Sequence, residues 1–130
     1  MFYAILCYHS ESALGALSQS EDAAMMTEIH AATQKIADQG KLGPVARLMP
    51  TGSAVTLRSS LTRPGARADQ RGEQVVLDGP FAETKEQLLG FWIVDCGTRE
   101  EAIEAARPLM HGGALEIRPL LEYFPPGSQK

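Results

Sequence analysis

The sequence lacks the residue patterns that define several large classes of protein. It holds 2 cysteines among 130 residues, Cys7 and Cys96, and neither belongs to a CxxC or CxxxH motif of the kind that binds zinc. The 3 histidines have no fixed spacing either. No apolar run approaches the roughly 20 residues that a membrane helix requires, and the apolar N-terminus lacks the basic flank of a signal peptide. We therefore expect a cytoplasmic protein with no membrane contact, no metal, no cofactor and no disulfide.

Basic residues are outnumbered, which excludes a further class. The chain has 12 Lys and Arg against 16 Asp and Glu, a formal net charge of -4. Nucleic-acid binding needs a basic face, so we expect no nucleic-acid partner. The 44% hydrophobic content can build a core, and the length suits one ordinary domain. We expect residues 1–124 to form that domain and residues 125–130 to form a loose tail.

Two continuous apolar runs, Phe2–Tyr8 and Leu88–Cys96, stand out in what is present. Continuous apolarity is typical of a strand that is buried on both faces, so we expect both runs in the middle of a sheet. We further expect the two strands to be parallel neighbours, which would place Cys7 close to Cys96 near the strand ends. Two buried free thiols are then the favoured state, and a redox switch is the alternative.

Two helices are predicted from their start signals and their apolar spacing. Ser18 with Glu21, and Thr98 with Glu101, have the spacing of a capping box. The apolar residues that follow each pair recur at helical intervals. Gly40 is a stop signal for the first helix, and Pro108 should interrupt the second helix or begin a separate final turn.

The remaining segments complete a pattern of strands and helices. Short strands are predicted at Val45–Met49, Ala54–Arg58 and Gln74–Leu77, followed by a last strand from Leu115 to Leu121 in which Glu116 and Arg118 share one face. The loop Ser59 to Glu73 carries Arg63, Arg67 and Arg71, which we interpret as a solvated surface rather than an anion site. The order is that of a ferredoxin-like βαββαβ fold: an antiparallel sheet with helices on one face and an extra hairpin before the third main strand. The other sheet face then has no cover, which predicts a homodimer formed through it.

The segment Asp78–Glu86, DGPFAETKE, is the most distinctive part of the chain. Asp78-Gly79-Pro80 is strong turn chemistry directly after a strand, and Phe81 could anchor the turn in the core. A rigid connection between strands is one interpretation. Four charged residues in so short a turn make a polar cleft the other interpretation.

This segment, together with the following LLGFWIVD, resembles the DGPF branch of the YCII-related family. The closing Leu115–Pro119 and the opening Tyr3–Tyr8 are similar to the same family, so the resemblance covers nearly the whole chain. It implies a ferredoxin-like α+β fold paired into a dimeric α/β barrel, and a family whose members mostly have no assigned activity. The resemblance also implies that, in some relatives, a His on the first helix forms a catalytic pair with an Asp.

Candidate site residues follow from the resemblance and from residue chemistry. His30 lies on the first predicted helix and could be a general base, although a packed or solvated histidine is the commoner case. Asp38, eight residues further on, would be about 12 Å away along the helix, so Asp78 or Glu83 would have to supply the carboxylate. Glu83, Lys85 and Arg118 are candidate ligand-binding residues, with surface salt bridges as the alternative.

Two functions are consistent with these observations. One is a dimeric small-molecule-binding protein with acid–base chemistry, of the lyase or isomerase kind, in a polar cleft near the DGPF turn. The other is a non-catalytic accessory or regulatory partner of an extracytoplasmic-function sigma factor, which the resemblance implies and no residue demonstrates.

Overall fold

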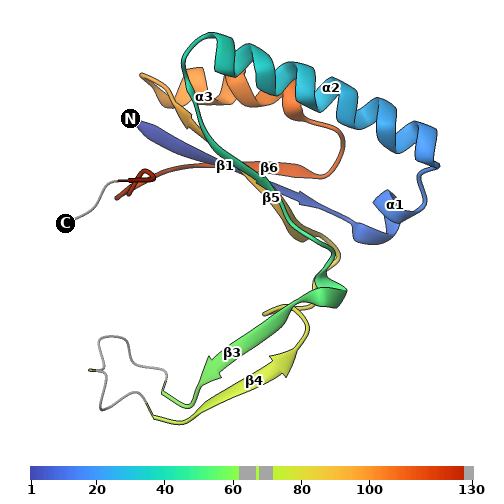
Figure 1. Ribbon diagram of the computed structural model, residues 1–130, viewed down its shortest axis with the longest axis vertical. Helices are drawn as coiled ribbons and strands as arrows, with labels where there is room; N and C mark the ends of the chain where they lie inside the picture. The colour runs from blue at the N-terminus through green and yellow to red at the C-terminus, as the bar shows by residue number, and fades with distance from the viewer. Residues whose placement is uncertain (62–66, 68–71, 128–130) are drawn as a thin grey trace. The chain divides into compact units, whose positions relative to one another are not determined.

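The computed structural model describes residues 1–61, 67 and 72–127 (Figure 1). Two compact units make up the chain: Met1–Leu48 with Lys85–Lys130, and Met49–Thr84. Of the predicted arginine loop, Arg67 is exposed, whereas Arg63 and Arg71 lie outside the described residues.

The larger unit contains a four-stranded antiparallel sheet in the order β2-β5-β1-β6. The central strands are β1 (Phe2–His9) and β5 (Gln87–Asp95), and the edges are β2 (Leu42–Arg47) and β6 (Ala114–Pro119). The prediction that the two continuous apolar runs are central strands is therefore confirmed. Pro119 ends an edge strand, where its missing N–H costs no ladder bond.

Helices α2 (Gln19–Asp38) and α3 (Arg99–Ala106) cover one face of this sheet (Figure 1). A full capping box begins α2: the Ser18 side chain accepts from the Glu21 N–H, and the Glu21 carboxylate accepts from the Ser18 N–H. The chain restarts after α3 in a separate turn, η3 (Arg107–Leu109), as Pro108 predicted. A short helix, α1 (Glu11–Gly15), was not predicted. Within the described residues, no helix combines the length and the apolar character that crossing a membrane requires.

The core lies between these helices and the sheet. Ile5, Val94 and Leu109 are its largest fully buried side chains. Trp92 is also buried, and its Nε1–H donates to the Thr33 hydroxyl on α2 at 3.1 Å. Burial of apolar surface therefore fixes α2 on this face, and one hydrogen bond sets its register.

The second face of the same sheet carries a strip of four apolar side chains, which we call the open-face strip: Ala4, Leu6, Phe91 and Ile93. Ala4 pairs with Ile93, and Leu6 pairs with Phe91, across the two central strands. Side chains alternate between the faces along a strand, so these residues point away from the core that holds Ile5. Neither α2 nor α3 lies on this face.

The two cysteines are far apart, so the expectation that they are close is wrong. The strands β1 and β5 are antiparallel neighbours, and Phe2 pairs with Asp95 at one end of the ladder. Cys96 lies at that end, where its N–H donates to the Met1 carbonyl, whereas Cys7 pairs with Gly90 further along. Six residues of extended chain separate the two positions by about 20 Å.

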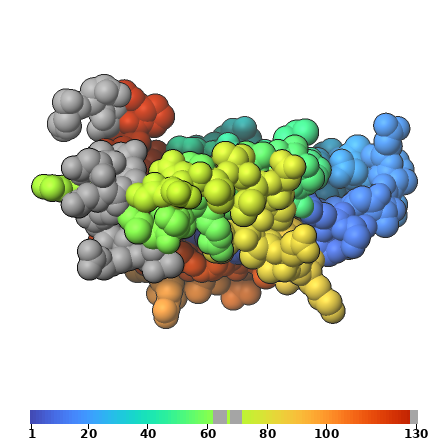
Figure 2. Space-filling model, turned by 90° about the horizontal axis from the view of Figure 1, so that it is seen from below, coloured from blue at the N-terminus to red at the C-terminus, as the bar shows by residue number. Residues whose placement is uncertain are grey.

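The smaller unit is a hairpin of β3 (Val55–Ser59) and β4 (Gln74–Asp78), preceded by the turn η1 (Thr51–Ser53). The predicted extra hairpin is confirmed. The predicted strands Val45–Met49 and Ala54–Arg58 correspond to β2 and β3, which belong to different sheets and have shifted bounds. Residues of the hairpin, coloured green to yellow in Figure 2, lie at the surface. Leu57 and Val76 are opposite one another and are 63% and 68% exposed.

Candidate functional site

The DGPF turn is fixed by the backbone of the hairpin. Gly79 has a φ of 97°, a conformation that side-chain-bearing residues rarely adopt. Its N–H donates to the Ala54 carbonyl at 2.8 Å, and its carbonyl accepts from the Thr56 hydroxyl at 2.9 Å. These bonds explain why a glycine follows Asp78: the turn closes onto the neighbouring strand only with a positive φ.

Phe81 does not anchor this turn in the core. Its side chain is 73% exposed, and the Arg58 guanidinium lies 5.2 Å above the ring centre. This cation–π contact stabilises an aromatic side chain that stays in water. Residues 82–86 form no helix before β5 begins.

The polar residues predicted in this segment remain exposed. Asp78 ends β4, and Glu83 and Lys85 follow in the irregular connection to β5. None of the three forms an ion pair with another described residue. They are therefore accessible to a ligand, and their predicted roles stay predictions.

His30 is exposed on α2, on the helix-covered side of the sheet. Arg118 lies on the opposite side, because it pairs with Ala4 of the open-face strip. The sheet therefore separates His30 from Arg118 within one chain. Asp38 is engaged elsewhere, since its carboxylate accepts from Gln34 at 2.9 Å. The pairing of His30 with Asp78 stays a prediction.

Arg118 belongs to a polar cluster at the edge of the open-face strip. Its Nε donates to Glu116 Oε2 at 3.0 Å, and its Nη2 donates to the same oxygen. The Tyr8 phenol is close enough to Glu116 for this carboxylate to raise the pKa of the phenol. We call Tyr8, Glu116 and Arg118 the polar trio. It joins β1 to the edge strand β6, with Glu116 opposite Leu6 and Arg118 opposite Ala4.

The protonation states of the polar trio follow from its contacts. The hydrogen bonds from Arg118 lower the pKa of Glu116, so this carboxyl is ionised at neutral pH. Desolvation, followed by the adjacent Glu116 charge, raises the pKa of Tyr8, so the phenol keeps its proton. The trio therefore presents a neutral hydroxyl, an anion and a cation side by side. Sequence reasoning identified Arg118 and considered Glu116, but it missed Tyr8, because a continuous apolar run does not show which of its residues face solvent.

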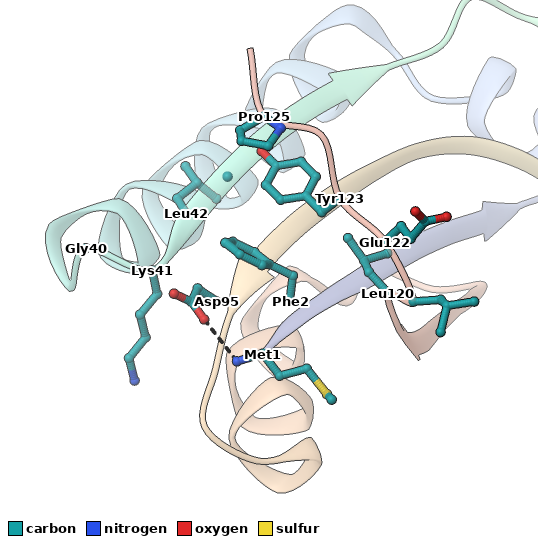
Figure 3. A pocket seen from close by; sticks show the side chains of 12 residues that line it. Met1, Phe2, Gly40, Lys41, Leu42, Asp95, Leu120, Glu122, Tyr123 and Pro125 are labelled. Atoms are coloured by element: carbon teal, nitrogen blue, oxygen red, sulfur yellow. Dashed lines mark hydrogen bonds and ion pairs between the residues drawn. The ribbon is translucent and has the colours of Figure 1, made fainter. Parts of the chain in front are cut away.

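A separate pocket lies at the other end of β1 (Figure 3). It encloses about 720 Å³ and is lined mainly by apolar side chains, including Phe2, Leu42 and Tyr123. The Phe2 and Tyr123 rings pack with centroids 4.7 Å apart, which holds the segment after β6 against β1. None of the predicted site residues lines this pocket.

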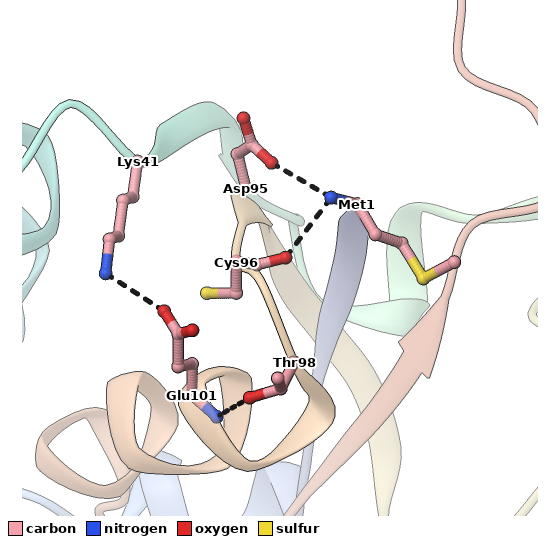
Figure 4. Close-up of polar contacts among 6 residues, drawn as sticks. All are labelled: Met1, Lys41, Asp95, Cys96, Thr98 and Glu101. Carbon is pink, nitrogen blue, oxygen red and sulfur yellow. Dashed lines mark hydrogen bonds and ion pairs between the residues drawn. The ribbon is translucent and has the colours of Figure 1, made fainter.

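The charged groups beside this pocket are engaged in structural contacts (Figure 4). The Met1 amino group donates to Asp95 at 3.3 Å and to the Cys96 carbonyl at 3.2 Å. Lys41 pairs with Glu101 at 3.3 Å, which links the start of β2 to the start of α3. Burial raises the pKa of the Cys96 thiol, so it stays protonated and unreactive. These contacts stabilise the fold and leave the polar trio as the better candidate for a ligand.

His9 and His111 are half-buried and structural. His9 Nδ1 accepts from the Ser10 N–H at 2.7 Å, so Nε2 carries the proton and donates to the His111 carbonyl at 3.2 Å. The His111 ring lies 2.9 Å from Glu28. No group of three or more potential metal ligands exists among residues 1–61, 67 and 72–127.

The fold and the site define a small α+β protein whose antiparallel sheet has one face covered by helices and one open face edged by a polar trio. The model of the YCII-related domain matches residues 1–123. An uncharacterized protein of Rhizobium meliloti (strain 1021) is 48% identical over 129 residues, which is 96% of each chain. The chain belongs to the YCII-related family.

Proposed function

We propose that this YCII-related protein is a homodimer that binds a small molecule between two open sheet faces. The observation that carries the proposal is the open-face strip, which places Leu6, Phe91 and Ile93 on a face that neither α2 nor α3 covers. Two such faces stacked together would bury the apolar side chains of both copies. In this proposal each copy has the ferredoxin-like arrangement, and the pair forms a dimeric α/β barrel.

The proposed ligand site includes Arg118. The proposed reaction at this site is acid–base chemistry of the lyase or isomerase kind. Asp78, Glu83 and Lys85, which we predicted at a polar cleft near the DGPF turn, are exposed and therefore accessible to a ligand. Asp78 is the preferred catalytic carboxylate. His30 would act from the helix-covered side of its own chain, so it ranks behind Asp78 as a catalytic residue.

Sedimentation equilibrium of the wild type and of Phe91→Glu tests the dimer. A charge in the middle of the strip cannot be buried without a partner, so we expect a wild-type dimer and a folded monomeric variant. Ala31→Glu adds the same charge at an exposed position of α2 and should remain a dimer. A monomeric wild type at tens of micromolar would overturn the proposal.

The ligand is sought by thermal shift, since a molecule that binds only the folded state raises its stability. A screen of small acids, phenolics and sugars should give at least one hit that Arg118→Gln abolishes. Asp78→Ala and His30→Ala then test the predicted catalytic residues: unchanged ligand binding and turnover in both variants would remove them from the site.

A second candidate function is that of an accessory partner of an extracytoplasmic-function sigma factor. The exposed apolar side chains of the β3–β4 hairpin, among them Leu57 and Val76, favour a protein contact. Binding of purified sigma factor, lost on Leu57→Asp, would support this function. The absence of binding would leave the small-molecule function alone.

A further inference from the structure

We propose that the polar trio binds the carboxylate of a small monocarboxylic acid whose flat, aromatic or unsaturated body lies on the open-face strip. This inference rests on the small-molecule function proposed above, and it names the class of ligand. It follows from the donors that Arg118 leaves unused, from the fixed charges around them and from the apolar surface beside them.

Arg118 keeps donors for a ligand after its own ion pair is made. A guanidinium presents five N–H groups in a rigid plane. Arg118 directs Nε and Nη2 to a single oxygen of Glu116, and among the described residues nothing bonds to Nη1. The outer edge of the plane, formed by Nη1 and the second N–H of Nη2, can therefore hold the two oxygens of a carboxylate. The side chain is 65% exposed, so this edge is accessible.

Glu116 and Tyr8 determine which acid groups the guanidinium of Arg118 can bind. Glu116 fixes the plane of Arg118, which lowers the entropy that binding costs. Its negative charge repels a second negative charge nearby, so a carboxylate is preferred over a phosphate or phosphonate dianion. The Tyr8 hydroxyl adds a neutral hydrogen-bonding group and no repulsion. The trio therefore selects an acid group that carries one charge.

The open-face strip selects the body of the ligand. Ala4 lies directly opposite Arg118, and Ile93 lies opposite Ala4 on the next strand, so an apolar path leads from the guanidinium across the sheet. Two strand spacings make this path about 10 Å long. That length suits one ring and a short side chain. A flat body is favoured, because a second copy facing the strip would leave only the gap between two packed sheets.

Calorimetric titration of the full chain with cinnamate and with its neutral amide, cinnamamide, tests the proposal. Charge-assisted hydrogen bonds to Arg118 should make cinnamate bind about tenfold or more tightly than the amide. Arg118→Gln should reduce cinnamate binding to the level of the amide, and Tyr8→Phe should weaken it several-fold. The wild type should bind benzoate more tightly than phenylphosphonate, and Glu116→Gln should reduce this difference in affinity.

Arg107→Gln is the matched control. Arg107 is also exposed and donates from Nε to a glutamate three residues earlier, Glu104, at 2.8 Å, but it lies directly after α3. The Arg107→Gln variant should bind cinnamate as tightly as the wild type does. Equal binding of cinnamate and cinnamamide, or an Arg118→Gln variant that binds like the wild type, overturns the carboxylate site while leaving the small-molecule function intact. A monomeric wild type that binds neither compound contradicts the proposed function itself.

Discussion

The two faces of the central sheet are built from the same strands and yet have opposite surroundings. Ile5 is fully buried beneath the helices, whereas its neighbour Leu6 is only half-buried on the open face. On β5, Val94 is likewise fully buried, whereas its neighbour Ile93 is only half-buried. One chain therefore completes the hydrophobic core on one face and leaves apolar residues without a helical cover on the other. The helix-covered face therefore holds the hydrophobic core, and the open face is the one on which we propose that binding takes place.

We expect the largest difference in stability when two adjacent residues, one on each face of the sheet, are truncated in turn. Ile5→Ala removes a fully buried side chain and should lower the free energy of unfolding by about 2–5 kcal/mol. Leu6→Ala, measured in the monomeric Phe91→Glu background, should cost less than half as much, because its side chain stays partly in water. Urea unfolding gives both values. Equal losses would mean that one chain buries both faces alike, which contradicts the account.

A smaller effect tests how α2 is positioned on the covered face. Thr33→Val leaves the buried Trp92 N–H without its acceptor, which should cost about 1–3 kcal/mol. Thr27→Val is a matched control on the same helix, since both hydroxyls donate to a helix carbonyl four residues earlier, but among the described residues Thr27 has no partner on the sheet. The control should stay within about 0.5 kcal/mol of the wild type. Similar losses of stability in both variants would show that the hydrogen bond from Trp92 to Thr33 does not stabilise the fold.

The smallest effect concerns pH and the open face. The pKa of Glu116 is lowered from 4.5 in the folded protein by the Arg118 hydrogen bonds, so its stabilising contribution is present above about pH 4.5 and is lost as the pH falls through the folded pKa. The urea midpoint of the wild type should therefore fall more between pH 6 and pH 3 than that of Glu116→Gln. Glu21, whose pKa is also lowered, is present in both proteins and cancels in the comparison. Identical pH profiles would show that the ion pair does not form in solution.

Sequence patterns predicted the covered face well because local chemistry determines most of it. The runs Phe2–Tyr8 and Leu88–Cys96 are central strands, and Ser18 caps α2, as predicted. The error about Cys7 and Cys96 arose because an apolar run shows burial but not strand direction. Direction depends on how the connections cross the sheet, which is a property of the whole fold.

The candidate site was less predictable, for a related physical reason. Alternation in β6 placed Glu116 and Arg118 on one face, which is confirmed by their mutual ion pair. Tyr8 was missed because its place in the cluster depends on the register between β1 and β6. Phe81 was wrongly expected in the core, since an aromatic residue in a turn can also be stabilised in water by a cation such as Arg58.

The most direct test of the open face as the binding face is an isotope-filtered NOE measurement on a mixture of labelled and unlabelled chains. We expect intermolecular contacts to the methyl groups of Leu6 and Ile93, and none to Ile5 or Val94 on the covered face. Intermolecular contacts confined to the outer surface of α2, with none at Leu6 or Ile93, would contradict it.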